Sequence, residues 1–327
     1  MDNKTSKVLF LRFSSLGDVI LSNFYAMKIK QMHPGWHLTW LVDSMYKELV
    51  KSQPWVDEVM TWDRQNEGNK GFIRTIREVR SRGFDILIDM HNTDRSSFFS
   101  FFSKIPERYA GRYRLPLAHK FHSFEGLYDK AEKISDCERY LCAPETTARI
   151  RSMLFDPDDR PVLTAAIGAS YEKKRWPVRN WIEFCIMAVT SGHQIYLTGN
   201  GPEEEKNAVL IAESVRDSSL KNLAGKLSIP ELVQVIDNSS LTVSGDTGAL
   251  HIARALGKDT IAMFGPSSIK NVSYVEGLKN VFYCDCPDKG CHDYECVRPC
   301  METISPALVY DRLASIGKSV KLKAADY

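Results

Sequence analysis

Short apolar runs alternate with longer segments of helical periodicity along both halves of the chain. In the first half the apolar runs predict strands at Val8–Phe13, His37–Val42, Val56–Thr61 and Asp85–Met90, and the helical spacing covers Asp18–Gln31 and Phe72–Ser81. In the second half strands are predicted at Val162–Ile167, Gln194–Thr198, Leu241–Ser244 and Thr260–Phe264, and helices at Asn180–Thr190, Glu203–Val215, Ile229–Asp237 and Ala249–Leu256. This alternation is typical of parallel βαβ units, so we expect an α/β protein with one doubly wound sheet in each half.

Chain length and proline spacing indicate where the two halves meet. A chain of 327 residues suits two domains of roughly 150 residues each. The stretch from Glu107 to Pro161 is irregular and rich in proline, and we place the passage between domains around Phe155–Arg160. We therefore predict one domain over 1–157 and a second over 158–327, with the last helix able to pack back on the first domain. Ligands of such sheets gather at the carboxyl ends of the strands, which favours a site in a cleft between the domains.

Composition narrows the class of protein only a little. The hydrophobic share of 43% and the charged share of 26% are ordinary for a globular protein, and a net charge of +2 does not indicate wholesale nucleic-acid binding. No apolar stretch approaches the roughly 20 residues that span a bilayer, and the N-terminus lacks the layout of a secretory signal. We expect a cytoplasmic protein whose membrane contact, if any, is peripheral.

The first strand-to-helix junction carries the motif Arg12-Phe13-Ser14-Ser15-Leu16-Gly17-Asp18. Small residues at such a junction let the backbone N–H groups of a helix N-terminus face an anion or a substrate hydroxyl. Asp18 falls near the predicted helix start, where a carboxylate also serves as a plain helix cap, so both interpretations stay open. The motif is neither Gly-x-Gly-x-x-Gly nor a phosphate loop, which argues against a dehydrogenase or an ATPase.

Three consecutive cations follow the first predicted strand of the second half. Segment 168–177 begins with a Gly-Ala-Ser turn that includes Ser170 and continues through Lys173, Lys174 and Arg175. Cations at the carboxyl end of a strand suit phosphate oxygens, and a solvated basic loop is the alternative. After the next strand, segment 197–203 forms a Gly-rich turn into an acidic helix start, which suits a nucleotide ribose or an ordinary βα connection.

The segment Ser244–Ala253 contains the sharpest motif of the chain. Asp246, Thr247 and Gly248 lie at a strand-to-helix junction and offer N–H groups and a hydroxyl to a diphosphate. Asp246 itself repels phosphate, so we expect it to fix the loop or to bind a sugar hydroxyl. His251 follows just over one helical turn later and is expected at the same site, with a satisfied helix histidine as the alternative.

Two clusters remain open from the residues alone. A basic run interleaved with Tyr109, Tyr113 and Phe121 consists of Lys104, Arg108, Arg112, Arg114, His119 and Lys120. It suits an anionic ligand or a solvated surface loop, and no other part of the chain resembles a nucleic-acid module. The other cluster is Cys284, Cys286, Cys291, Cys296 and Cys300. Four thiolates can close a structural zinc site, but the spacing lacks Cys-x-x-Cys pairs, so a reduced packed loop is the alternative.

Taken together, the motifs resemble those of family 9 glycosyltransferases, which include the heptosyltransferases of lipopolysaccharide inner-core assembly. The Ser-Ser-Leu-Gly-Asp start, the Lys-Arg-Trp-Pro segment, the Asp-Thr-Gly-x-x-His block and the Phe-Gly-Pro-Ser turn occur in the family's order between Val8 and about Leu313. The cysteine-rich stretch ending in Cys-Met adds to the similarity. One departure is the segment Ile88–Asn92, which differs from the Asp-x-Gln pattern common in the family.

The resemblance implies a GT-B architecture of two facing Rossmann-like domains with an interdomain cleft, an N-terminal acceptor domain and a C-terminal sugar-nucleotide domain. It implies transfer of a heptose from ADP-heptose to an anionic glycolipid acceptor, with inversion and without an obligatory metal, at the cytoplasmic face of the inner membrane. Asp18 matches the general base, and Lys174 matches the lysine at the diphosphate. The donor-binding set is expected to be Lys174, Arg175, Ser170, Gly199, Glu203, Asp246, Thr247, Gly248 and His251, with Glu205 as the alternative to Glu203 at the ribose. The acceptor-binding set is expected to be Ser15, Gly17, Arg112, Arg114, His119 and Lys120.

The chemistry of glycosyl transfer is consistent with these roles. A sugar hydroxyl is a poor nucleophile and gains from a carboxylate that takes its proton. Departure of a nucleoside diphosphate builds negative charge, which cations can stabilise where no metal does so. Three alternatives stay open: a family member with another nucleotide sugar or a capsule or glycoprotein acceptor, a two-domain nucleotide-sugar epimerase, and a non-catalytic sugar-nucleotide-binding protein.

Overall fold

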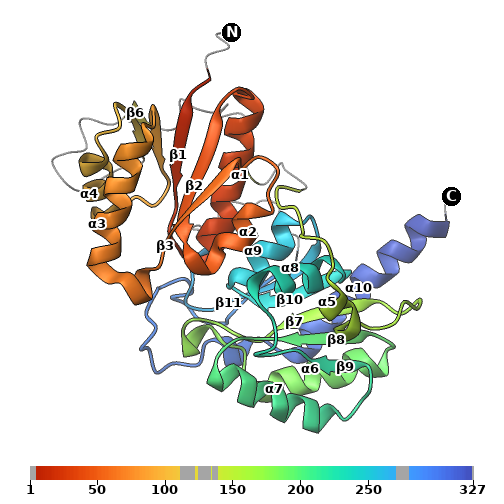
Figure 1. Cartoon of the computed structure of the whole chain (residues 1–327). Helices are drawn as coiled ribbons and strands as arrows, with labels where there is room; N and C mark the ends of the chain where they lie inside the picture. The colour runs from red at the N-terminus through yellow and green to blue at the C-terminus, as the bar shows by residue number, and fades with distance from the viewer. Residues whose placement is uncertain (1–4, 111–121, 124–133, 135–138, 270–279, 326–327) are drawn as a thin grey trace. The chain divides into compact units, whose positions relative to one another are not determined.

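The computed structural model describes residues 5–110, 122–123, 134, 139–269 and 280–325, and within these it contains two parallel sheets flanked by helices (Figure 1). The chain divides into two compact units, Met1–Pro144 and Glu145–Tyr327. The α/β class with two doubly wound sheets is confirmed. The basic residues Arg112, Arg114, His119 and Lys120 lie outside the described residues.

The sheet of the first unit has the strand order β3-β2-β1-β4-β5-β6. Its strands are β1 (Lys7–Leu11), β2 (His37–Asp43), β3 (Glu58–Trp62), β4 (Ile86–Asp89), β5 (Glu107–Ala110) and β6 (His122–Ser123). Its helices are α1 (Leu16–Met32), α2 (Lys47–Lys51), α3 (Arg64–Arg82) and α4 (Asp94–Ser103), with a 3₁₀ turn at Ser44–Tyr46. Val8 on the central strand pairs in register with Leu38 of β2 and Ile86 of β4, and all three are buried, which explains why these strands are continuous apolar runs.

The sheet of the second unit has the strand order β12-β11-β10-β7-β8-β9, which is the same topology when it is read from β9. Its strands are β7 (Val162–Ala166), β8 (Gln194–Thr198), β9 (Leu220–Asn222), β10 (Leu241–Gly245), β11 (Asp259–Phe264) and β12 (Val281–Tyr283). Its helices are α5 (Ala148–Met153), α6 (Val178–Thr190), α7 (Pro202–Val215), α8 (Ile229–Asp237), α9 (Gly248–Ala255) and α10 (Pro306–Ala325), with 3₁₀ turns at Glu172–Lys174 and Met301–Thr303. The core between the sheet and α6 contains the buried rings of Trp176, Trp181 and Phe184.

The boundary between the units lies earlier than the sequence analysis placed it. Residues 145–157 pack with the second unit, because Ile150 is buried beside Tyr196 and the Phe155 N–H donates to the Tyr196 hydroxyl at 2.7 Å. Arg149 of α5 also pairs with Glu231 of α8. The described part of α10 contacts α6 and β11 of its own unit.

Both sheets have a topological switch point, where neighbouring strands send their connections in opposite directions. In the first sheet this point lies between β1 and β4, and in the second it lies between β7 and β10. Ligands of open α/β sheets bind beyond the carboxyl ends of the strands at such points. The residues that follow these four strands are therefore the candidates for ligand binding and catalysis.

Candidate functional sites at the two switch points

Asp18 lies at the switch point of the first sheet, in the first turn of α1. Ser15 is the N-cap residue, and Asp18 accepts from the Ser15 N–H at 3.1 Å and from the Ser15 hydroxyl at 3.0 Å, which completes a capping box. Arg12, at the end of β1, pairs with the same carboxylate. Gly17 follows in the same turn, so both small residues expected at this site lie beside the acid.

The contacts of Asp18 leave one of its oxygens available. The Ser15 N–H, the Ser15 hydroxyl and the Arg12 guanidinium all meet Oδ2, and Oδ1 has no partner within the described part of the chain. The side chain is 46% exposed. The capping role and the catalytic role are thus compatible, because the cap uses one oxygen and holds the other toward solvent.

His91 and Arg64 complete this site, and the sequence analysis assigned neither of them a role. His91 follows β4, and its ring packs edge-on to Phe13 at 5.1 Å. Burial, reinforced by the positive charges of Arg12 and Arg64, lowers the pKa of His91 to about 4, so the ring is neutral at pH 7. Arg64 begins α3 and donates to the Ser14 hydroxyl. A lone histidine in the departure segment Ile88–Asn92 was the only signal for this part of the site.

The second switch point holds an ion pair between the two motifs that flank it. Lys174, after β7, donates to Asp246, after β10, with 2.8 Å between Nζ and Oδ2, and both side chains are about one-sixth exposed (16% and 17%). His251 Nε2 lies 3.9 Å from the other oxygen, Asp246 Oδ1. Burial acts to raise the pKa of Asp246, but the hydrogen bond and charge of Lys174 outweigh burial and hold the pKa below its usual range.

The loop between β10 and α9 presents a helix N-terminus beside this ion pair. Thr247 is the N-cap residue and Gly248 is the first residue of α9, so the N–H groups of the first turn are free of helical partners. The Thr247 hydroxyl lies 2.9 Å from that of Ser244. A Cβ added at Gly245 would lie 3.2 Å from the Lys174 carbonyl oxygen, so the two motifs pack backbone against backbone. The structure therefore brings Lys174, Asp246, Thr247, Gly248 and His251 together, and their role in donor binding stays a prediction.

Arg175 and the acidic start of α7 form a second layer of this site. The Arg175 guanidinium pairs with Glu203, and its other nitrogen lies 3.1 Å from Oε1 of Glu204, which is almost fully buried. A Cβ added at Gly199 would lie 3.0 Å from the Cβ of Glu204, so that turn can only hold glycine without movement. Glu203, the glutamate predicted for this site, is 58% exposed, whereas Glu204 turns inward; three consecutive glutamates in the sequence do not reveal which one does so. Ser170 is exposed on the same connection.

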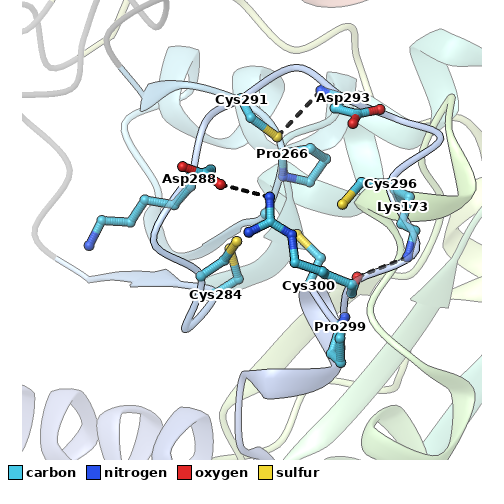
Figure 2. Close-up of a pocket in the computed structure, with 13 residues that line it drawn as sticks. Lys173, Pro266, Cys284, Asp288, Cys291, Asp293, Cys296, Pro299 and Cys300 are labelled. Atoms are coloured by element: carbon cyan, nitrogen blue, oxygen red, sulfur yellow. Dashed lines mark hydrogen bonds and ion pairs between the residues drawn. The ribbon is translucent and has the colours of Figure 1, made fainter.

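All five clustered cysteines, Cys284, Cys286, Cys291, Cys296 and Cys300, line one pocket together with Lys173 and Asp288 (Figure 2). Within the described residues, no group of three or more His, Cys, Asp or Glu side chains is placed to hold a metal ion. Burial and a neighbouring Cys284 thiol raise the pKa of Cys300 to about 12, so this side chain is a thiol at neutral pH when no metal is bound.

Two doubly wound units, one with an exposed acid at its switch point and the other with a Lys174–Asp246 ion pair beside a helix N-terminus, fit an α/β protein of the GT-B class. The model of glycosyltransferase family 9 (heptosyltransferase) matches residues 120–302, which is more than half of the chain. The chain belongs to this family and is a glycosyltransferase.

Curated relatives and solved structures agree with this assignment. The chain is similar to lipooligosaccharide heptosyltransferase 2 of Haemophilus influenzae, with 26% identity over 80% of this chain and 84% of the relative. It is 25% identical to lipopolysaccharide heptosyltransferase 1 of Pseudomonas aeruginosa over 80% of this chain and 79% of the relative. A family 9 glycosyltransferase from Veillonella parvula has a TM-score of 0.78 at 17% identity and covers 96% of this chain and 97% of its own. The ADP-heptose lps heptosyltransferase II of E. coli has a TM-score of 0.73 at 20% identity, covering 96% and 99%.

Proposed function

We propose that this glycosyltransferase moves a heptose from ADP-heptose to a lipopolysaccharide inner-core acceptor, with inversion at the anomeric carbon and without an obligatory metal. The observation that carries the proposal is that one chain holds both groups the reaction needs: Asp18 Oδ1, which the described residues leave without a partner, at the first switch point, and Lys174 beside a helix N-terminus at the second. The names of the similar heptosyltransferases support heptose as the sugar, and one solved relative, E. coli heptosyltransferase WaaC, was determined with ADP-2-deoxy-2-fluoro heptose. The TM-score of that relative is 0.71.

The donor is assigned to the second unit. The N–H groups at Thr247 and Gly248 and the ammonium of Lys174 converge where a diphosphate gains from hydrogen bonds and positive charge. Asp246 does not bind the phosphates. It positions Lys174 through their ion pair, and its other oxygen lies 3.9 Å from His251 Nε2. Glu203 and Arg175 lie next to the turn at Gly199, on the side assigned to the ribose.

The acceptor hydroxyl is assigned to Asp18. In the proposed step its proton passes to Oδ1 of Asp18 while its oxygen forms a bond to the anomeric carbon, and the bond from that carbon to the diphosphate oxygen breaks. Attack opposite the leaving group inverts the anomeric centre. The negative charge that builds on ADP is stabilised by Lys174 and by the N-terminus of α9, which is the work a divalent metal does in other transferases.

The remaining parts of the proposal concern the acceptor and the place of action. The basic residues Arg112, Arg114, His119 and Lys120, together with Ser15 and Gly17, are assigned to the anionic inner core. We propose action at the cytoplasmic face of the inner membrane. Across the helices that the structure describes, none combines the length and the apolar content needed to cross a bilayer.

Calorimetric titration with ADP, UDP and GDP tests the donor assignment. We expect selective ADP binding that weakens at least tenfold in Lys174→Ala and stays unchanged in the matched variant Lys173→Ala, whose ammonium donates to the Arg298 carbonyl at 3.1 Å outside the ion pair. The same titration after EDTA treatment should give the same affinity. Selective UDP or GDP binding would replace heptose with another sugar, and binding of none of the three would contradict the enzymatic proposal.

A further inference from the structure

Helix α4 of the first unit buries small polar residues and exposes large apolar ones, which reverses the usual pattern of a helix packed on a sheet. Its sequence is Asp-Arg-Ser-Ser-Phe-Phe-Ser-Phe-Phe-Ser, and its buried face consists of four serines and one ring, Ser96, Ser97, Phe99, Ser100 and Ser103. The hydroxyls of the last three of these serines donate to carbonyls of their own helix at 2.7–2.8 Å, which gives each buried hydroxyl a partner. The buried face is thus filled by small residues.

The outer face of α4 carries the large aromatic rings instead. Phe98, Phe101 and Phe102 are 48%, 38% and 46% exposed, and Ile73 on the neighbouring helix α3 is 49% exposed. Phe98 and Phe102 stack at 6.5 Å, and Phe101 meets Phe102 edge-on at 5.2 Å. These four exposed side chains form a contiguous apolar surface. Burying such a surface against a partner removes it from water, so contiguous apolar surfaces mark interaction sites.

Cations border this apolar surface. Phe72, Ile73, Ile76, Phe98 and Phe102 line an open groove together with Arg77 and Arg80. The Arg80 Nε–H donates to the Phe102 carbonyl at 2.6 Å and so joins α3 to the end of α4. The two helices lie side by side in Figure 1. The nearest acids on α3 are already paired, Glu67 with Arg74 and Glu78 with Arg82. In the described part of the chain Arg77 makes no ion pair, so the border keeps a net positive charge.

We propose that the surface formed by Phe98, Phe101, Phe102, Ile73, Arg77 and Arg80 docks on an anionic phospholipid bilayer. The rings enter the boundary between headgroups and acyl chains, and the two guanidiniums meet phosphates. This rests on the proposed function in one respect, since it names the surface that brings the enzyme to a lipid-anchored acceptor.

Charge favours a bilayer over a second copy of the chain. In a symmetric dimer each patch would face the same patch of its partner, so the interface would hold Arg77 and Arg80 of both copies and no acidic side chain of the patch to neutralise them. An anionic membrane supplies negative charge for both guanidiniums. It also accommodates the exposed rings without a complementary protein surface, because lipids rearrange around them. Attraction to such a surface is worth about fivefold in binding for each cation near it.

Flotation of the full chain with vesicles tests the docking surface. Vesicles of phosphatidylethanolamine with one quarter phosphatidylglycerol should carry the protein, and vesicles of phosphatidylcholine alone should not. We expect Phe98→Ser/Phe102→Ser to lower partitioning about tenfold or more and Arg77→Glu to lower it more than about fivefold, with wild-type binding weakened by salt. The matched controls lie on α7 of the second unit, where Val209 and Leu210 are exposed to a similar degree: Val209→Ser/Leu210→Ser and Lys206→Glu should bind as wild type.

Three outcomes would overturn the docking surface: equal binding by all the variants, equal binding to both kinds of vesicle, or a wild-type dimer that Phe98→Ser/Phe102→Ser converts to a monomer. ADP titration of the same variants separates this inference from the proposed function. Vesicle binding without ADP binding would contradict the donor assignment and support the docking surface. ADP binding without vesicle binding would support the donor assignment and contradict the docking surface.

Discussion

Replacing Lys174 with Met removes one charge from the ion pair at the second switch point and keeps most of the apolar stem. The partner, Asp246, is then left as a carboxylate that is 17% exposed, with His251 at 3.9 Å and the Ser267 hydroxyl as its remaining polar neighbours. A hydrogen bond to a charged group contributes about 1.5–3 kcal/mol, and the residual exposure of the pair places the expected loss near the lower end, at about 1.5–2 kcal/mol. For a domain of this size that corresponds to a fall in Tm of about 3–8 °C.

The sign of the pH dependence provides an independent check of this reasoning. Because the folded pKa of Asp246 lies below its ordinary value, the pair stabilises the fold above that ordinary value, and the contribution disappears as pH falls through the lower folded pKa. The difference in stability between wild type and Lys174→Met should therefore be constant near neutral pH and shrink below about pH 4.

Thermal unfolding without ligand, followed by calorimetry at several pH values, measures both quantities. Lys173→Met is the matched control, because the Lys173 ammonium bonds to an exposed carbonyl, and its Tm should change by less than about 2 °C. Equal Tm values for the two variants, or a difference that grows as pH falls, would refute the role given to the ion pair.

Three further changes test separate parts of the structure. Gly265→Ala should lower the free energy of unfolding by about 1–3 kcal/mol in denaturant titration, because the added Cβ would lie 2.8 Å from the Cys300 sulfur, whereas Gly35→Ala meets nothing within 4 Å and should be near neutral. Tyr196→Phe should cost about 1–2 kcal/mol in the same assay, since it removes the acceptor at 2.7 Å from the Phe155 N–H. Wild type should lose stability between about pH 6.5 and 4, where an unfolded but not a folded His91 takes up a proton, and His91→Gln should lose less over that range in pH-dependent melting.

The strands and their order along the chain could be predicted because parallel strands buried on both faces are continuous apolar runs. The four strand-to-helix motifs could be located for the same reason, since each directly follows such a run. Helix α4 was not predicted. Phe98, Phe101 and Phe102 do fall at helical spacing, but its four serines favour turns and caps in a sequence-based prediction, and here they fill the buried face while these rings are exposed. The edge strands β9 (Leu220–Asn222) and β12 (Val281–Tyr283) were missed because they have three residues each and are only partly buried.

The candidate sites divide in a similar way. Asp18, Lys174 and Asp246 could be named because each belongs to a motif at a strand end, where the fold itself places ligands. Glu204 and Arg64 could not be named, because their inward positions depend on contacts with residues distant in sequence. The early domain boundary is another such case, since Tyr196 draws the segment around Phe155 to the second unit through a contact that no local pattern records.

Transfer from ADP-heptose to an inner-core acceptor by wild type and Asp18→Asn is the most direct test of the central claim. Asn keeps a hydrogen-bond acceptor for the Ser15 cap and cannot take a proton, so ADP affinity should persist while kcat falls about 10²–10⁴-fold. The wild-type product should be a heptosylated acceptor with inverted anomeric configuration. A product with retained configuration, or transfer by Asp18→Asn at the wild-type rate, would contradict the mechanism.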